Sequence, residues 1–271
     1  MEANYMKPVV LFRKHLAEEG EFEVCQNYFE TVELRTKCKD NLVIGRYACL
    51  PHYNELAADL CMVGSRLINL PQEHRWIANF NWYDRLKDYT PRTWFGYDFN
   101  LSNCCDYNGP FVVKGRTNSK KFQWNKMMFA RDKLQATNIA CDLMADSYIG
   151  EQGIVFREYV PLETYEIGVN GLPFTNEWRM FFHRDILLSC GYYWSIAEKT
   201  DYECPPEAIA FATEVAKIAK SFATFFVLDV AKTEDGRWIL IEVNDGQQSG
   251  LSENNPHMLY KNLATVVNAT Y

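Results

Sequence analysis

The chain has 271 residues, of which 48% are apolar and 23% charged, and it carries a formal net charge of -7. This composition predicts a globular protein with one large domain or two to three small lobes, and it excludes an intrinsically disordered chain. An acidic balance without a run of Lys and Arg also argues against nucleic acid as a partner, because phosphate binding requires a basic patch.

The cysteines and the first residues bear on the cellular compartment. Nine cysteines, an odd number, are scattered along the chain without a C-x-x-C pair, so we expect reduced thiols rather than disulfides or a zinc site. The opening segment MEANYMKPVVLFRK has only PVVLF as an apolar stretch, which is too short for a secretory signal or a membrane span. We therefore expect a cytoplasmic protein with no membrane partner.

The predicted elements begin with an N-terminal α/β lobe over residues 1–75. The strand-like PVVLF and NLVIGRY precede a helix in HYNELAADLCMV, where apolar side chains recur at helical spacing and Gly64 can end the helix. An aromatic segment follows, and FNLSNCCDYNGP then predicts a loop. We place a lobe boundary near residues 75–109.

Two further lobes are predicted, over residues 76–160 and 161–271. The second lobe contains the strand FVVK, a helix over 125–145 and the strand IVFREYV. The third contains the strands EWRMFF and DILLSCGYYW, a helix after Pro206 and two final strands. The fold class is therefore α/β.

The final two strands form a hairpin with paired acidic residues, in FFVLDVAKTEDGRWILIEVND. The dipeptide Asp235-Gly236 is a strong signal for a tight hairpin turn. If these are the two loop residues, stepping outward along both strands places Asp229 directly opposite Glu242. A longer turn would shift this pair, and a bulge would break it.

The pair has a chemical consequence. Asn244 shares the face of Glu242, and the packed core is expected on the other face, from Leu228, Val230, Ile239, Ile241 and Val243. Carboxylates directly opposite each other are destabilising unless something compensates. Mg²⁺ fits, because it binds a few carboxylate or amide oxygens and completes its shell with water and phosphates. The alternative is a surface hairpin with outward-facing acids.

With Asp229 followed by Glu242-x-Asn244 on the next strand, the sequence resembles the C-terminal half of an ATP-grasp domain, whose metal ligands stand in this order. More narrowly, VIGRY, FVVKGRTNSKK, EWRMFF and LDVAKTEDGRWILIEVNDGQQSGL are similar to the ATP-grasp clade named for one arginine and two lysines, found in phages and bacteria. A eukaryotic cell-division-cycle assembly factor of translation initiation is a more distant relative. The resemblance covers residues from about 85 to 255.

This resemblance implies an ATP-grasp fold with a Rossmann-like N-terminal lobe and a nucleotide held between two α+β lobes. If the source is viral, the expected compartment is the host cytoplasm. The implied cofactors are ATP and Mg²⁺, with the metal held by Asp229, Glu242 and Asn244. The implied trio of one arginine and two lysines is Arg46, Lys114 and Lys120.

The resemblance also assigns roles around the nucleotide. Lys114 would reach the phosphates, and the loop with Arg116, Ser119 and Lys120 would cover them. Because this loop lacks a run of glycines, its cover would depend on Lys120 and Lys121 rather than on backbone amides. The remaining implied residues are Glu158, Tyr159 and Val160 around the base, Glu177 at the ribose hydroxyls, and Arg179 at the phosphates or acyl-phosphate.

Simpler interpretations exist for single residues: Lys114 alone would be a solvated charge at a strand end, and Arg46 alone a salt-bridge partner. Two functions fit the whole pattern. The first is an ATP-dependent carboxylate–amine ligase that acts through an acyl-phosphate, with Arg179, Lys114 and Arg46 as catalytic residues. The second is a non-catalytic ATP-binding assembly module. The sequence leaves open the acceptor, which is a small molecule, peptide or protein, and the oligomeric state.

Overall fold

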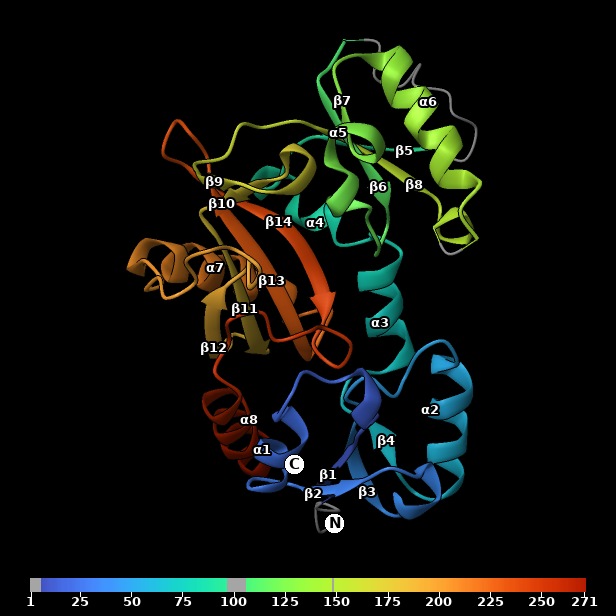
Figure 1. Cartoon of the computed structure of the whole chain (residues 1–271). Coiled ribbons are helices and arrows are strands. Elements are labelled where there is room, and N and C mark those ends of the chain that lie inside the picture. Colours follow the sequence, from blue (N-terminus) through green and yellow to red (C-terminus); the bar gives the residue numbers. More distant parts are fainter. Residues whose placement is uncertain (1–5, 97–105, 148) are drawn as a thin grey trace.

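The computed structural model describes residues 6–96, 106–147 and 149–271, so residues 99–105 of the predicted loop lie outside the described part. The N-terminal lobe, at the bottom of Figure 1, is a parallel sheet in the order β2-β1-β3-β4. Strand β1 is almost wholly buried, as expected for a parallel strand covered on both faces. The elements of this lobe are β1 (Lys7–Leu11), α1 (Glu21–Gln26), β2 (Glu30–Val32), β3 (Asn41–Ile44), α2 (Tyr53–Met62) and β4 (Arg66–Leu67), with 3₁₀ turns at Lys14–Leu16 and Arg35–Lys37.

Helices α3 (Pro71–Ala78) and α4 (Tyr83–Leu86) and a 3₁₀ turn (Lys87–Tyr89) lead to the second lobe, at the top of Figure 1. Its antiparallel sheet has the order β5-β8-β6-β7. The lobe comprises β5 (Thr93–Gly96), β6 (Phe111–Gly115), α5 (Trp124–Met127), β7 (Phe129–Ala130), α6 (Lys133–Met144) and β8 (Ile154–Glu158), with 3₁₀ turns at Lys121–Gln123 and Gly150–Gln152.

The predicted helix over 125–145 is two helices, α5 and α6, because residues 128–132 are not helical. Strand β7 interrupts it and pairs with β6. Asp132 then adopts an extended conformation and caps α6, because its side chain accepts a hydrogen bond from the Gln135 backbone. The capping acid and the strand pairing together outweigh the helical pattern.

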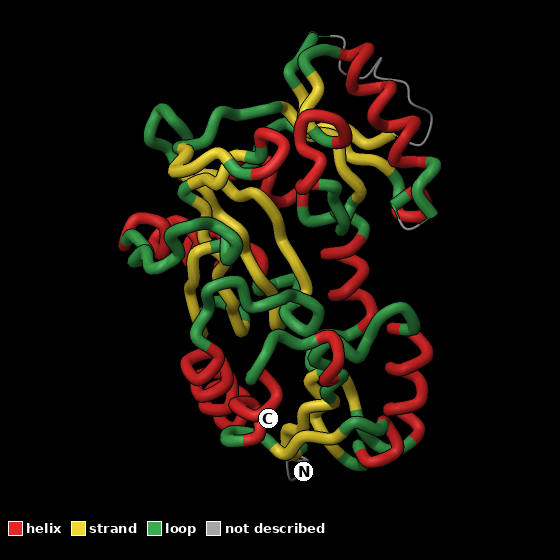
Figure 2. The backbone as a smooth tube through the Cα atoms, in the orientation of Figure 1, coloured by secondary structure: helices red, strands yellow, loops and turns green. Residues whose placement is uncertain are grey.

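The third lobe is built on an antiparallel sheet in the order β12-β11-β13-β14. Figure 2 shows its strands in yellow between the other two lobes. Helix α7 packs on one face, while α8 contacts β12 and also α1 and β1 of the N-terminal lobe. The elements are β9 (Thr164–Ile167), a 3₁₀ turn (Val169–Gly171), β10 (Pro173–Thr175), β11 (Glu177–His183), β12 (Ile186–Tyr192), α7 (Pro206–Ala219), β13 (Phe225–Lys232), β14 (Trp238–Asp245) and α8 (Pro256–Thr270).

Alternation along β11 and β13 positions the site. Leu228 and Val230 point into the core shared with α7. On the opposite face, Phe181 and Val227 pack beneath α8 and the N-terminal lobe. Side chains two residues apart share a face, so Arg179 and Asp229 lie on the same face as Phe181 and Val227. This charged part of the face lies beyond the helix that covers the apolar part.

The β13–β14 hairpin combines a wrong turn prediction with a correct pairing. Thr233 and Arg237 face each other across a three-residue loop, in which Gly236 has a φ of +88°. A bulge between Leu240 and Glu242 then adds one residue, Ile241, to β14. The two shifts cancel, so Asp229 does pair with Glu242.

The bulge also corrects the predicted core. Leu228, Val230 and Val243 are buried in it as expected, but Leu240 occupies the place predicted for the two isoleucines. Ile239 and Ile241 instead face the cleft between the second and third lobes.

Two expectations concern the chain as a whole. The seven cysteines of the described residues are free thiols. No described helix combines the length and apolar character needed to cross a membrane.

Candidate functional site

A cavity lies between the second and third lobes, and its empty space of about 940 Å³ is partly open to solvent. Its walls come from β6 and β8 on one side, from β11 and β14 on the other, and from the segment that joins β8 to β9. One end is apolar, and its surfaces are provided by Val112, Met128, Leu172, Ile239 and Ile241. Glu158, at the end of β8, and Tyr159 and Val160, in the connecting segment, also line the cavity. This end therefore has the apolar walls and nearby backbone groups that suit a planar aromatic ring such as a nucleobase.

The other end of the cavity adjoins a row of charged side chains. Arg179 pairs with Asp229 across β11 and β13, and Asp229 pairs with Glu242 across β13 and β14. Lys114, at the end of β6, reaches across the cleft and donates a hydrogen bond to Glu242. The row therefore has a cation at each end and two carboxylates in the middle.

The two carboxylates are compensated within the protein. Arg179 donates to both oxygens of Asp229, at 2.9 Å from Nε and 2.8 Å from Nη2. Asn244 donates to the same carboxylate at 3.1 Å. The opposed acids are therefore compensated by side chains of the protein itself, without a divalent cation. Burial lowers the pKa of Arg179, but the Asp229 carboxylate outweighs it and holds that pKa above its ordinary value.

Glu177 lies two residues before Arg179 on the same face and lines the cavity. Burial, reinforced by the nearby Asp229, raises the pKa of Glu177 to about 8. The Thr175 hydroxyl donates to its carboxyl group at 3.0 Å. Glu177 therefore holds its proton to a higher pH than an ordinary carboxyl group.

The loop after β6 places its lysines in opposite directions. Lys121 lines the cavity and donates to the Tyr193 hydroxyl at 3.3 Å, and burial lowers its pKa. Lys120 instead pairs with Asp146 at 2.6 Å, behind the loop. Ser119 lines the cavity, whereas Arg116 and Lys120 are not among its lining residues. Of the two lysines expected to cover the phosphates, Lys121 therefore faces the cavity and Lys120 does not.

One charged residue of the cavity wall was not predicted from the sequence. Arg157, on β8, donates to the Ile241 carbonyl and to the Thr90 hydroxyl, both at 2.5 Å. Burial lowers its pKa to about 10, although Glu242 opposes this. Its Nε atom is buried without a hydrogen-bond partner. Arg157 is thus a buried cation at the cavity wall, and its position within the strand-like IVFREYV gave no signal.

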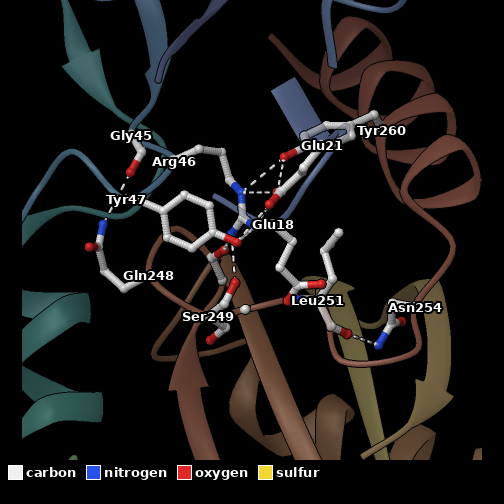
Figure 3. Close-up of polar contacts among 12 residues, drawn as sticks. Glu18, Glu21, Gly45, Arg46, Tyr47, Gln248, Ser249, Leu251, Asn254 and Tyr260 are labelled. Atoms are coloured by element: carbon white, nitrogen blue, oxygen red, sulfur yellow. Dashed lines mark hydrogen bonds and ion pairs between the residues drawn. The ribbon is translucent and has the colours of Figure 1, made fainter. Parts of the chain in front are cut away.

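Arg46 lies outside this cavity, buried between the N-terminal lobe and α8 (Figure 3). It forms an ion pair with Glu21 at 2.5 Å and donates to the carbonyls of Gly246 and Ser249 at 2.7 and 2.9 Å. Its Nε also donates to the Tyr260 hydroxyl at 3.0 Å. This placement leaves no donor directed at the nucleotide cavity, so a direct catalytic contact does not fit. Arg46 is the salt-bridge partner of the simpler interpretation.

The residues present fit a magnesium ion. Asp229, Glu242 and Asn244 bring two carboxylates and an amide oxygen to one face, and these hard oxygen ligands are the type that Mg²⁺ selects. In the described part of the chain, no group of three or more His, Cys, Asp or Glu side chains is arranged to hold a metal ion by itself. The set would therefore hold a metal whose remaining positions are filled by water and phosphates.

A cavity between two α+β lobes, with lysines from one lobe and paired acids from the other, is the layout expected of an ATP-grasp protein. The family model that matches residues 100–263 is the ATP-grasp domain of family 3 in the clade named for one arginine and two lysines. The chain belongs to this family. No curated protein matches the chain.

Solved structures share the fold at low sequence identity. The D-cycloserine synthetase DcsG is 13% identical, with a TM-score of 0.59 over 97% of this chain and 100% of that one. The ATP-grasp ligase PsnB, solved with a minimal precursor, Mg and ADP, is 12% identical, with a TM-score of 0.56 over 97% and 98%. D-alanine–D-alanine ligase from Bacillus anthracis, complexed with ATP, is 15% identical, with a TM-score of 0.54 over 89% and 86%.

Proposed function

We propose that this chain is a Mg-ATP-dependent ligase that activates a carboxylate and joins it to an amine or a related nucleophile. The observation that carries the proposal is the charged row at the polar end of the cavity. It brings cations from two lobes together with carboxylates of the kind that bind Mg²⁺. This arrangement is the one that phosphoryl transfer requires, because that reaction depends on positioning and on neutralising charge.

The cavity would orient ATP by its two unlike ends. The base packs between Ile239 and Ile241 and the wall of the second lobe, beside Tyr159 and Val160. The phosphates reach Lys114 and Lys121, which lie at the polar end. Mg²⁺ held by Asp229, Glu242 and Asn244 would supply charge neutralisation at the phosphate oxygens. Lys114 and Arg179 then exchange their carboxylate partners for substrate oxygens.

The proposed reaction has two steps. A carboxylate oxygen of the substrate attacks the γ-phosphorus, the bond from phosphorus to the β,γ-bridging oxygen breaks, and an acyl-phosphate and ADP form. The amine then attacks the acyl carbon, phosphate leaves, and the nitrogen releases a proton. Arg179 and Lys114 stabilise the charge that develops on the transferred oxygens.

The relatives support a range of acceptors. The similar structures include a D-cycloserine synthetase, an ATP-grasp ligase complexed with a minimal precursor, and a D-alanine–D-alanine ligase. We propose that the acceptor here is likewise a small molecule or a peptide. The proposed compartment is the cytoplasm, because ATP is available there.

Binding and turnover can be tested separately. Mg-ATP at a hundredfold excess over its Kd should stabilise the fold by about 2.7 kcal/mol, which differential scanning fluorimetry detects as a higher midpoint. ATP labelled with oxygen-18 at the β,γ-bridge should then be incubated with a panel of amino acids, hydroxy acids and acidic peptides. A ligase moves the label to a non-bridging β position when its carboxylate is present, without the amine.

The outcomes separate the two candidate functions. Exchange that is lost in Lys121→Met and retained in Lys120→Met supports a ligase that uses the cavity described here. Stabilisation by Mg-ATP without exchange or ADP release across the panel supports the non-catalytic ATP-binding module. No change in the midpoint at millimolar Mg-ATP would overturn the nucleotide assignment itself.

A further inference from the structure

The bulge in β14 is held by side chains from outside its own sheet. Ile241 is the extra residue of this bulge, and the residues on either side of it, Leu240 and Glu242, keep their partners on β13. A bulge interrupts the regular ladder of hydrogen bonds, so the carbonyl groups beside it need other partners. Here the carbonyls of Leu240 and Ile241 both accept hydrogen bonds from a distant part of the chain.

The donors are Arg157, on β8, and Thr90, which lies just before β5. The Arg157 guanidinium donates from Nη1 to the Ile241 carbonyl and from Nη2 to the Thr90 hydroxyl, both at 2.5 Å. That hydroxyl donates in turn to the Leu240 carbonyl at 2.7 Å. Both donor side chains are buried. Arg157 and Thr90 together therefore form a clamp that joins the second lobe to the bulge of the third.

The bulge decides which way Glu242 points. Between the turn and Leu240 the pairing of β13 with β14 is regular. A ladder that continued without a bulge would pair Glu242 with Leu228 rather than with Asp229. Since Leu228 lies in the core shared with α7, the Glu242 carboxylate would then be directed into that core. The bulge instead brings Glu242 to the face of Asp229.

We propose that Arg157 is a positioning residue of the ligase. With Thr90 it holds the bulge of β14, and the bulge keeps the Glu242 carboxylate beside Asp229, where both would bind Mg²⁺. This role rests on the proposed function. Arg157 acts through Glu242, so a residue of the second lobe sets the geometry of a metal ligand in the third.

Arginine suits the clamp for two reasons. Its planar guanidinium donates in two directions at once, which a lysine ammonium at the end of a flexible chain does not reproduce. Its charge also attracts Glu242, which opposes the effect of burial on the pKa of Arg157. Geometry and charge can be separated, because Arg157→Lys keeps the charge and loses the fork, whereas Thr90→Val keeps the guanidinium and loses the link to Leu240.

Amide hydrogen exchange of the full chain without nucleotide measures the clamp directly. The quantity compared is the exchange rate of peptides from residues 238–245 divided by that of peptides from residues 177–183, so that global unfolding cancels. This ratio should rise about tenfold in Arg157→Met and by less in Thr90→Val, because hydrogen bonds to the bulge are lost. Leu143→Ala is the matched control, since Leu143 is buried in the core of the second lobe, and it should leave the ratio unchanged.

Calorimetry of ATP binding with and without Mg²⁺ measures the consequence for the metal site. The factor by which Mg²⁺ raises the affinity for ATP should fall about tenfold in Arg157→Met, as is typical when a group that orients a metal ligand is removed. Thr90→Val should lower this factor less, and Arg157→Lys should recover only the part that depends on charge. Leu143→Ala should leave the factor unchanged, because a general loss of stability does not move Glu242.

Several results would overturn the proposal. They are an unchanged exchange ratio in the clamp variants, an unchanged effect of Mg²⁺ despite faster exchange, equal changes in Leu143→Ala, and full recovery by Arg157→Lys, which would leave charge as the only contribution. If Arg157→Met does not fold, Thr90→Val and Arg157→Lys give the same comparison. If the parent fails to bind Mg-ATP, the proposed function falls, while the exchange ratio still decides whether Arg157 and Thr90 hold the bulge.

Discussion

Neutralising Asp229 should destabilise the protein in the absence of nucleotide. The Asp229 side chain is 1% exposed and its partner Arg179 is 13% exposed, and two hydrogen bonds join them. In Asp229→Asn the geometry is kept, but the guanidinium loses its counter-charge in a buried place. Removing one partner of a buried ion pair costs about 3–5 kcal/mol.

The lower end of this range applies here. The asparagine retains one oxygen acceptor, and Arg179 keeps its hydrogen bond to the Gly250 carbonyl at 3.1 Å. We therefore expect a loss of about 3 kcal/mol in the free energy of unfolding. At about 2–4 °C per kcal/mol for a chain of this size, the midpoint should fall by about 6–12 °C.

Thermal and urea unfolding of matched variants test this expectation. Asp235→Asn is the control, because Asp235 forms an exposed pair with Arg237 in the same hairpin, and it should change stability by less than about 0.5 kcal/mol. Adding Arg179→Met to Asp229→Asn should recover part of the loss, since both charges are then gone. An Asp229→Asn protein as stable as the parent would refute the reasoning and restore the view that the opposed acids repel each other.

Three other predictions concern single side chains. Lys121→Met should weaken ATP binding by about tenfold or more in calorimetry, since it removes a charge-assisted contact, while Lys120→Met should change it little; equal effects would contradict the opposite orientations of the two lysines. Burial raises the pKa of Glu177 from 4.5 to about 8. Below pH 4.5 the group is protonated in both the folded and the unfolded state, and between pH 4.5 and about 8 its raised pKa lowers the free energy of unfolding as the pH rises. The midpoint of Glu177→Gln relative to the parent should therefore increase over that interval, and a constant difference would show that Glu177 has an ordinary pKa. Arg46→Met should lower the free energy of unfolding in urea by about 3–5 kcal/mol, because the buried Glu21 carboxylate loses its partner. Combining Arg46→Met with Glu21→Gln should recover part of this loss. No recovery would mean that packing, not charge, holds Arg46.

The sequence predicted those strands whose apolar pattern is visible within a few neighbouring residues. Strands β6, β8, β11, β13 and β14 follow from apolar runs bounded by polar residues and turns. Helix α8 was not among the predicted elements, although it carries a readable signal. Asn255 caps the helix, Pro256 opens it, and Leu259, Leu263 and Val267 recur at helical spacing.

The details that were missed depend on contacts between distant segments. The bulge at Ile241 places Leu240 in the core with α7, a contact that no hairpin rule contains. Lys120 turns away from the cavity because it pairs with Asp146, which lies after α6 and is distant from the loop in sequence. Arg46 is buried against Glu21 and the loop after β14, 25 and about 200 residues distant in sequence.

The mutual pairing of the charged row has a consequence for the order in which ligands bind. If Mg²⁺ arrived alone and took the carboxylates, Lys114 and Arg179 would be left buried without counter-charges. If ATP arrived alone and took the two cations, the carboxylates would face each other and the phosphates. Each ligand therefore removes the penalty that the other creates, so Mg²⁺ and ATP should bind with positive linkage, each raising the affinity for the other by the same factor.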